Sequence, residues 1–109
     1  MYAVTISMRA LTVEGASIIH QASLDVIEVS LGEDGCIFFD VLFDEKDPLL
    51  LRFYEAYESK KAFEEHLEAP HTKEWIQICM PHVDKSTIRM PESVSDRTKQ
   101  QKSNNEISG

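Results

Sequence analysis

The sequence predicts an α+β domain in which one antiparallel sheet carries its helices on a single face. Three observations lead to this fold class. Segments of alternating apolar and polar residues, typical of strands, occur near the start, in the middle and toward the end of the chain. Amphipathic segments with helical periodicity lie between them. The length of 109 residues is enough for one hydrophobic core, and therefore for one domain.

The first strand is predicted over residues 2–8, where large apolar side chains occupy every second position. Thr12 is a typical N-cap for the helix that follows it. Many β-branched residues make this segment a mediocre helix former, so we expect tertiary packing to stabilise it. The glycines and acids of residues 32–35 end the helix.

The stretch 36–57 predicts two strands joined by the acidic turn 44–48. In the first of these strands, apolar side chains point to both faces, and such a strand must be covered on both sides. The helices of this chain supply one cover. We expect a partner subunit to supply the other, because the chain has too few further elements.

Two helices and a last strand complete the domain. Ser59 is a typical N-cap for a helix that ends at Pro70, and a second short helix is predicted over residues 71–80. The last strand is predicted over residues 84–90. Residues 92–109 contain one Val, one Ile and no aromatic residue, so we predict a domain of residues 1–91 and a disordered tail of residues 92–109.

The resulting order, β-α-β-β-α-β with a divided second helix, is the ferredoxin-like split β-α-β arrangement of a four-stranded antiparallel sheet. This arrangement leaves one face of the sheet bare, and here that face is apolar. Two such sheets packed face to face would bury it. The sequence therefore predicts a homodimer that forms through the open sheet face.

Composition excludes several classes of partner. The net charge of −8 argues against nucleic acid as a partner, because binding phosphates requires clustered Lys and Arg.

The sequence also bears on location. No apolar run approaches the roughly 20 residues of a membrane-spanning helix, and the first residues lack the pattern of a secretory leader. The two cysteines, Cys36 and Cys79, are too few for a disulfide framework, so we expect reduced thiols and a cytoplasmic location.

Residues 35–75 resemble the antibiotic biosynthesis monooxygenase (ABM) family of dimeric α+β barrels. The resemblance rests on the order and spacing of six short groups: GC at 35–36, FDV at 39–41, DP at 47–48, YE at 54–55, AFEEHL at 62–67 and PH at 70–71. It is nearest to the branch that includes quinol monooxygenases and the autoinducer-2 degradation isomerase. It implies one pocket per subunit between sheet and helices, and chemistry without metal, flavin or haem. The Asn that the monooxygenase branch often uses has no counterpart before the tail.

Three residues are predicted to be catalytic. Glu55 shares an apolar strand face, where burial raises a carboxyl pKa and makes the group a general acid or base near neutral pH. His66 lies on the inward side of its helix and His71 follows Pro70, and the resemblance places both at the pocket, where imidazole can transfer protons. The alternatives are structural hydrogen bonds for Glu55 and His66, and helix capping or a surface position for His71.

Aromatic residues are expected to bind a flat or ring-shaped substrate, with core packing as their alternative role. They are Phe39, Phe53, Tyr54, Tyr57 and Trp75. His20 lies in the middle of the first helix and is expected at the surface.

A possible metal-binding set consists of four residues: His66, His71, Cys79 and His82. Pro81 interrupts the Cys79–His82 pair and no second tight pair exists, so the sequence predicts no metal site and no cofactor.

Three functions remain open from the sequence. The first is a cofactor-independent monooxygenase that deprotonates a small phenolic or quinol-like substrate. The second is an isomerase of a small hydroxy-ketone, with or without a phosphate group, and Arg9, Arg52 and Lys73 are the candidate ligands of such a phosphate. The third is a non-catalytic dimer that binds a small molecule.

Overall fold

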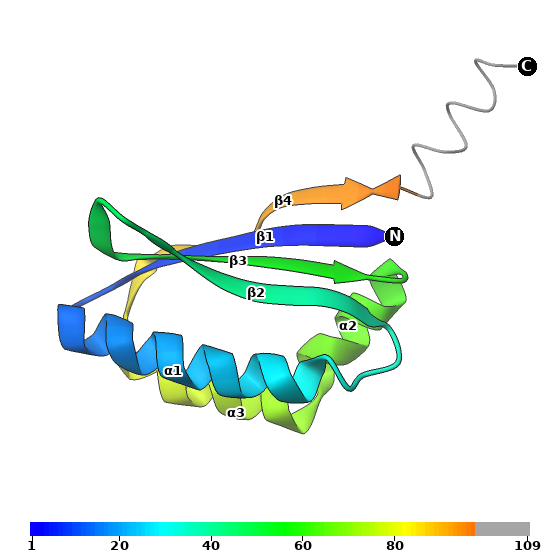
Figure 1. Cartoon of the computed structure of the whole chain (residues 1–109), viewed down its shortest axis with the longest axis horizontal. Coiled ribbons are helices and arrows are strands. Elements are labelled where there is room, and N and C mark those ends of the chain that lie inside the picture. The colour runs from blue at the N-terminus through cyan, green and yellow to red at the C-terminus, as the bar shows by residue number, and fades with distance from the viewer. Residues whose placement is uncertain (98–109) are drawn as a thin grey trace, which may run out of the picture.

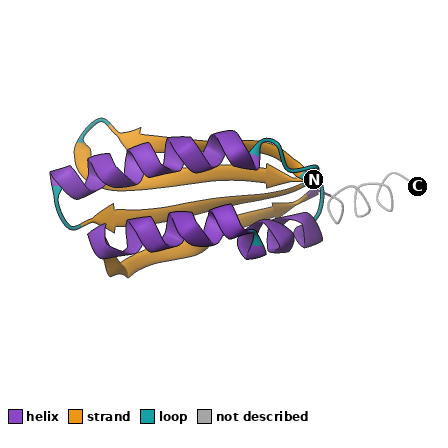
Figure 2. Ribbon diagram, turned by 90° about the horizontal axis from the view of Figure 1, so that it is seen from below, coloured by secondary structure: helices purple, strands orange, loops and turns teal. Residues whose placement is uncertain are grey.

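The computed structural model describes residues 1–97 of the chain as one layer of strands against one layer of helices. The elements are β1 (Tyr2–Ala10), α1 (Val13–Ser30), β2 (Cys36–Asp44), β3 (Asp47–Tyr57), α2 (Lys60–Glu68), α3 (Pro70–Cys79), the 3-10 helix η1 (Met80–His82) and β4 (Val83–Asp96). The strands form one antiparallel sheet in the order β2-β3-β1-β4, and the helices lie below it in Figure 1. Figure 2 shows α1 and α3 side by side on the same face of the sheet. The predicted ferredoxin-like α+β architecture is confirmed.

The predicted helix starts are confirmed by their capping bonds. Gly15 N–H donates to the Thr12 hydroxyl at 2.9 Å, and Ala62 N–H donates to the Ser59 hydroxyl at 3.1 Å. Pro70 occupies the first turn of α3, where its missing N–H costs no helical hydrogen bond. Within the described residues, no helix is both long enough and apolar enough to cross a bilayer.

The core lies between the sheet and the helices. On β3, the residues that face the helices are Leu51, Phe53, Glu55 and Tyr57, and each is at most 2% exposed. Because side chains alternate along a strand, this face is the one that the sequence predicted for Glu55. A carboxyl group therefore lies inside an otherwise apolar layer.

The opposite side of the sheet is left uncovered by the described residues. Its apolar side chains include Phe38, Leu42 and Tyr54, which are 44%, 50% and 42% exposed. The rings of Phe38 and Tyr54 meet edge to face, with centroids 5.5 Å apart. We call the surface formed by these three residues the open face. The homodimer through this surface stays a prediction.

The predicted start of the tail at residue 92 is wrong for residues 92–96. These residues continue β4, which pairs with β1 from Val4↔Val94 to Tyr2↔Asp96. Strand pairing uses the backbone, so the polar composition of this segment does not prevent it. Pro91 is tolerated because β4 is an edge strand. The rest of the predicted tail, residues 98–109, lies outside the described part of the chain.

Candidate active site

Glu55 lies in the middle of the sheet, where its backbone pairs with Val4 of β1 and Phe39 of β2. Its side chain is 1% exposed. The Tyr57 hydroxyl donates a hydrogen bond of 2.6 Å to Oε1 of Glu55. The second oxygen, Oε2, is buried and has no hydrogen-bond partner among the described residues. One oxygen of this carboxyl is therefore held, and the other is free to take a proton.

Burial raises the pKa of Glu55 to about 7, and the nearby charge of Glu33 adds to the rise while the Tyr57 hydrogen bond opposes it. Both forms of the carboxyl are therefore populated near neutral pH. Burial, together with the adjacent Glu55, also raises the pKa of Tyr57 far above its ordinary value. Tyr57 thus remains protonated and acts as a hydrogen-bond donor.

His66 lies on the inner side of α2, with a side chain that is 2% exposed. Its Nε2 is 3.6 Å from Oε1 of Glu55, which is just longer than a hydrogen bond. Its Nδ1 is 2.7 Å from Oε1 of Glu33. Burial lowers the pKa of His66, and the hydrogen bond that its Nδ1–H donates to Glu33 works in the opposite direction. The ring therefore stands between two carboxyl groups, one buried and one near the surface.

Glu33 was not predicted from the sequence, which assigned residues 32–35 only to the end of a helix. The loop after α1 carries Glu33 to His66 because Gly35 packs directly on α2. A Cβ atom at Gly35 would lie 2.5 Å from Cβ of Ala62, closer than real Cβ contacts allow. The only sequence signal was an acidic residue two positions before the GC pair of the family resemblance.

His71 lies in the first turn of α3, on the same side of the site as Glu33. Its Nε2 is 3.5 Å from Oε2 of Glu33, and this nitrogen is buried without a hydrogen-bond partner among the described residues. The two imidazole rings are 6.1 Å apart between centroids. We call Glu33, His66 and His71 the Glu33 cluster. The three predicted catalytic residues are thus brought together, with Glu33 as the link.

The Glu33 cluster also contains the residues best placed to hold a metal ion. One donor atom from each member lies within 4.8 Å of the others. Among the described residues, Cys79 and His82 do not belong to this group, so the four-residue set considered from the sequence is not assembled. Cys79 is buried, and burial raises the pKa of its thiol to about 11.

Most of the predicted substrate-binding aromatics are part of the core, and two of them, Phe39 and Tyr57, contact His66 of the cluster. Phe39, Phe53 and Trp75 are 3%, 0% and 4% exposed and pack edge to face on one another. The Phe39 ring also meets the His66 ring edge to face at 5.6 Å. Tyr54, by contrast, lies on the open face and is not brought together with the others.

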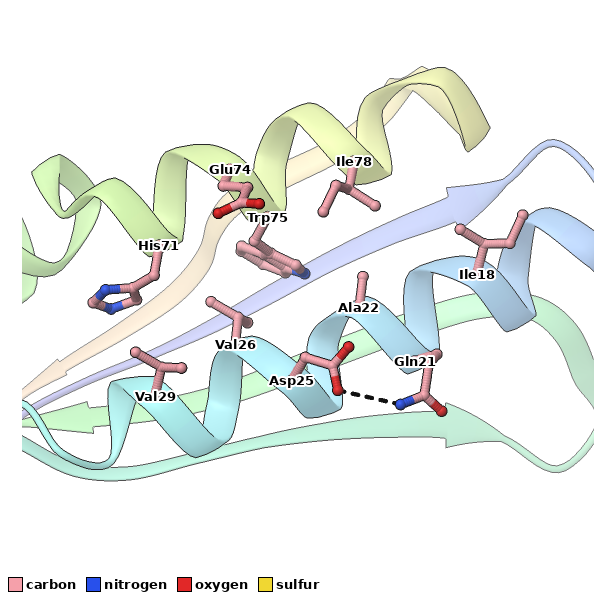
Figure 3. Close-up of a pocket in the computed structure, with 10 residues that line it drawn as sticks. All are labelled: Ile18, Gln21, Ala22, Asp25, Val26, Val29, His71, Glu74, Trp75 and Ile78. Carbon is pink, nitrogen blue, oxygen red and sulfur yellow. Dashed lines mark hydrogen bonds between the residues drawn. The ribbon is translucent and has the colours of Figure 1, made fainter.

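Two hollows reach the cluster from different sides. A groove of about 460 Å³ runs between α1 and α3, with Val26 and Val29 on one wall and Trp75 on the other. Figure 3 shows His71 and Trp75 projecting from α3 toward α1 in this groove. A smaller hollow of about 290 Å³ is lined by residues that include Glu33, Cys36, Tyr57 and His66.

Neither hollow is lined by Glu55 itself. The sequence predicted an apolar chamber with Glu55 inside, whereas Glu55 is reached only past Tyr57 and His66. His20 is remote from the cluster, because it packs on Phe43 beside a separate hollow.

Comparisons with known proteins agree with this fold. The model of the family "ABM: Antibiotic biosynthesis monooxygenase" matches residues 1–78. No curated protein matches the chain. Among solved structures, an antibiotic biosynthesis monooxygenase is 21% identical with a TM-score of 0.76, and the match covers 88% of this chain and 97% of that one.

Two further structures give the same result. A Nitrosomonas europaea protein, provisionally assigned as an antibiotic biosynthesis monooxygenase, is 26% identical with a TM-score of 0.72, over 77% of this chain and 87% of that one. A conserved protein of Methanosarcina mazei Go1 is 19% identical with a TM-score of 0.72, and the match covers 87% of this chain and 89% of that one. The narrower quinol monooxygenase or autoinducer-2 branch stays a prediction. Because the family model matches well over half of the sequence, this chain belongs to the antibiotic biosynthesis monooxygenase family.

Proposed function

We propose that this protein is a cofactor-independent monooxygenase that acts on a small phenolic or quinol-like substrate, with Glu55 as the general base. Membership of the ABM family supports oxygenase chemistry. The single observation that carries the finer proposal is the free Oε2 of Glu55. This oxygen is buried and unpartnered among the described residues, while Tyr57 holds the other oxygen of the same carboxyl. A buried, oriented carboxylate with one open lone pair is the arrangement that a general base needs.

Deprotonation prepares the substrate for oxygen. Because Glu55 lines neither hollow, the substrate reaches it by displacing the side chain of His66. Oε2 of Glu55 then takes the phenolic proton, and the electron pair of the O–H bond stays on the substrate as a ring-delocalised anion. An electron-rich ring carbon that still carries hydrogen, ortho or para to that oxygen, is then oxidised by O₂. The ring gives up four electrons and keeps one oxygen atom as a quinone, and the second oxygen atom leaves as water.

The proton then has a route to the surface. It passes from Glu55 to Nε2 of His66 across 3.6 Å, a gap that closes with a small movement of either side chain. The Nδ1 proton of His66 moves to Glu33, 2.7 Å away. The Glu33 side chain is 22% exposed, so it can release the proton to water.

Access and assembly belong to the same proposal. The substrate enters from the hollow of about 290 Å³, because that hollow is lined by Tyr57 and His66, the two polar neighbours of Glu55. The subunits pair as a homodimer through the open face, which the apolar surface of Phe38, Leu42 and Tyr54 supports.

The test is oxygen consumption with a panel of phenols and quinols, without added metal or cofactor. We expect one O₂ consumed per quinone formed. We also expect Glu55→Gln to lower the rate by about 10²–10⁴-fold, the usual loss when a general base is removed. If no compound of the panel causes oxygen consumption, or if Glu55→Gln keeps full activity, the proposal is contradicted.

An isomerase of a hydroxy-ketone is the second candidate. The observation that favours it is that Glu55, His66 and Glu33 form a continuous set of acid and base groups, which suffices for proton transfer between two carbons. Turnover of a hydroxy-ketone that continues without oxygen would favour this candidate over the first.

A further inference from the structure

We propose that the Glu33 cluster is a binding site for a divalent first-row transition metal ion, and for zinc in particular. The ligands are one oxygen of Glu33, Nδ1 of His66 and Nε2 of His71. This site goes beyond the proposed function, which needs no metal, and its existence does not depend on that function.

The geometry of the three donors fits one ion. They come from three separate segments, the α1–β2 loop, α2 and α3, yet their donor atoms lie within 4.8 Å of one another. Zinc binds nitrogen and oxygen ligands at about 2.0–2.2 Å, so the ligands of one tetrahedral ion are roughly 3.3 Å apart. Measured from one oxygen, Oε2 of Glu33, the separations are 3.2 Å to Nδ1 of His66 and 3.5 Å to Nε2 of His71, both close to that value. The third separation, between the two imidazole nitrogens, is within 4.8 Å, so side-chain adjustments bring all three donors around one metal.

An unpartnered nitrogen marks the same place. Nε2 of His71 is buried and has no hydrogen-bond partner among the described residues, although it points to Oε2 of Glu33 at 3.5 Å. A buried polar atom without a partner costs free energy unless something binds it. A metal ion supplies that partner and at the same time occupies the oxygen of Glu33.

The surroundings of His66 are those of a metal ligand. In metal sites, a ligating imidazole usually donates its other ring N–H to a carboxyl group, which fixes the ring. Here Nε2 of His66 faces Oε1 of Glu55 at 3.6 Å, behind the proposed ligand atom Nδ1. The chain therefore places a carboxyl group behind the site, just beyond hydrogen-bond distance of the ring, in addition to its three ligands.

The donor set selects the kind of ion. Two imidazoles and one carboxylate suit zinc and other first-row transition metals, whereas calcium and magnesium prefer all-oxygen sites. The hollow of about 290 Å³ lined by Glu33 and His66 leaves room for water as a fourth ligand. A net charge of −8 favours the approach of a cation.

Zinc binding would affect the proposed reaction. A metal on Nδ1 of His66 displaces the proton that this nitrogen passes to Glu33, so the route from Glu55 to the surface is interrupted. Zinc is therefore expected to inhibit activity. This consequence, unlike the binding itself, rests on the proposed function.

Binding can be measured without a substrate. Metal-free full-length protein, prepared with EDTA and then freed of it, is titrated with zinc in a calorimeter. The visible absorption of cobalt(II) serves as a second probe of coordination. We expect one ion per chain, and at least 10-fold weaker binding in Glu33→Gln and His71→Ala. These two residues are partly exposed, so both variants should fold.

Matched controls are Glu28→Gln and His20→Asn, which remove the same residue types at positions outside the cluster, and both should bind zinc like the wild type. The absence of a binding isotherm, or equal affinity in Glu33→Gln, His71→Ala and the wild type, overturns the site. If zinc binds but leaves oxygen consumption unchanged, the proton route is wrong and the metal site stands.

Discussion

Nδ1 of His66 lies 2.7 Å from Oε1 of Glu33, although 33 positions separate the two residues in the chain. This contact connects the loop after α1 to the inner side of α2. It also sets the direction of the imidazole, so that the opposite nitrogen faces Glu55. The buried carboxyl of β3 is linked through it to a carboxyl near solvent. The proposed proton route and the proposed metal site both depend on this one contact.

The approach of Gly35 to Ala62 is expected to hold that contact in place. Gly35→Ala would put two Cβ atoms 2.5 Å apart, so the loop or α2 must move. We expect a loss of stability of about 1–3 kcal/mol, as for other overpacked contacts, measured by urea unfolding. The control is a double-mutant cycle with Ala62→Gly, which removes the opposing methyl group. If Gly35→Ala costs as much in the Ala62→Gly background, steric crowding between these positions is not the cause.

The hydrogen bond from Tyr57 to Glu55 is expected to stabilise the fold and to hold down the pKa of the carboxyl. Tyr57→Phe leaves a buried oxygen without its donor, which should cost about 1–3 kcal/mol. Because this bond lowers the pKa of Glu55, its loss should raise that pKa further. Denaturant unfolding and carboxyl titration by NMR measure the two effects. Tyr54→Phe is the matched control, since Tyr54 lies on the open face; an equal effect there would contradict the assignment.

Stability should depend on pH through Glu55. The pKa of this group is about 7 in the folded chain, against an ordinary value of 4.5, so the folded state binds its proton more tightly than the unfolded state. Its contribution to stability is therefore full below about pH 4.5 and is lost as the pH rises to about 7. The loss is at most about 3 kcal/mol, from 1.36 kcal/mol per pKa unit.

Urea unfolding of metal-free wild type and Glu55→Gln at pH 5 and pH 8 measures this effect. The wild type should lose more stability than the variant between the two pH values. Parallel losses would mean that Glu55 is not responsible.

The open face should mediate dimerisation. We expect the wild-type protein to be a dimer by light scattering, and Leu42→Asp to be a folded monomer, because a buried unpaired charge opposes association. Leu24→Asp, at an exposed position of α1, is the control and should remain dimeric. A monomeric wild type, or a dimeric Leu42→Asp variant, would exclude this interface.

The sequence predicted the fold and part of the site because periodicity encodes which side of an element a residue faces. Glu55 and His66 were expected to face inward from strand alternation and helix amphipathicity, and both are buried. The same alternation places Tyr54 on the opposite face of the strand, so its assignment to the substrate site did not follow from the pattern. In the structure Tyr54 lies on the open face, away from the site.

Other features could not be predicted because they depend on tertiary geometry. Glu33 reaches His66 only because a loop glycine packs on α2, and no local pattern reports such a contact. The extension of β4 to Asp96 depends on backbone pairing with β1, to which side-chain composition is a poor guide. Periodicity thus predicts which side of a helix or strand a residue faces. Contacts between a loop and a distant element can be seen only in the folded structure.

The role of Glu55 as a buried base is tested most directly by a carbon-13 NMR titration of its carboxyl group in metal-free protein, with the signal assigned by its absence in Glu55→Gln. It asks whether the core of this fold holds an ionisable base, and it needs no substrate. We expect a midpoint near pH 7. A midpoint near the ordinary value of 4.5 would contradict it, because Glu55 would then be a solvated carboxylate.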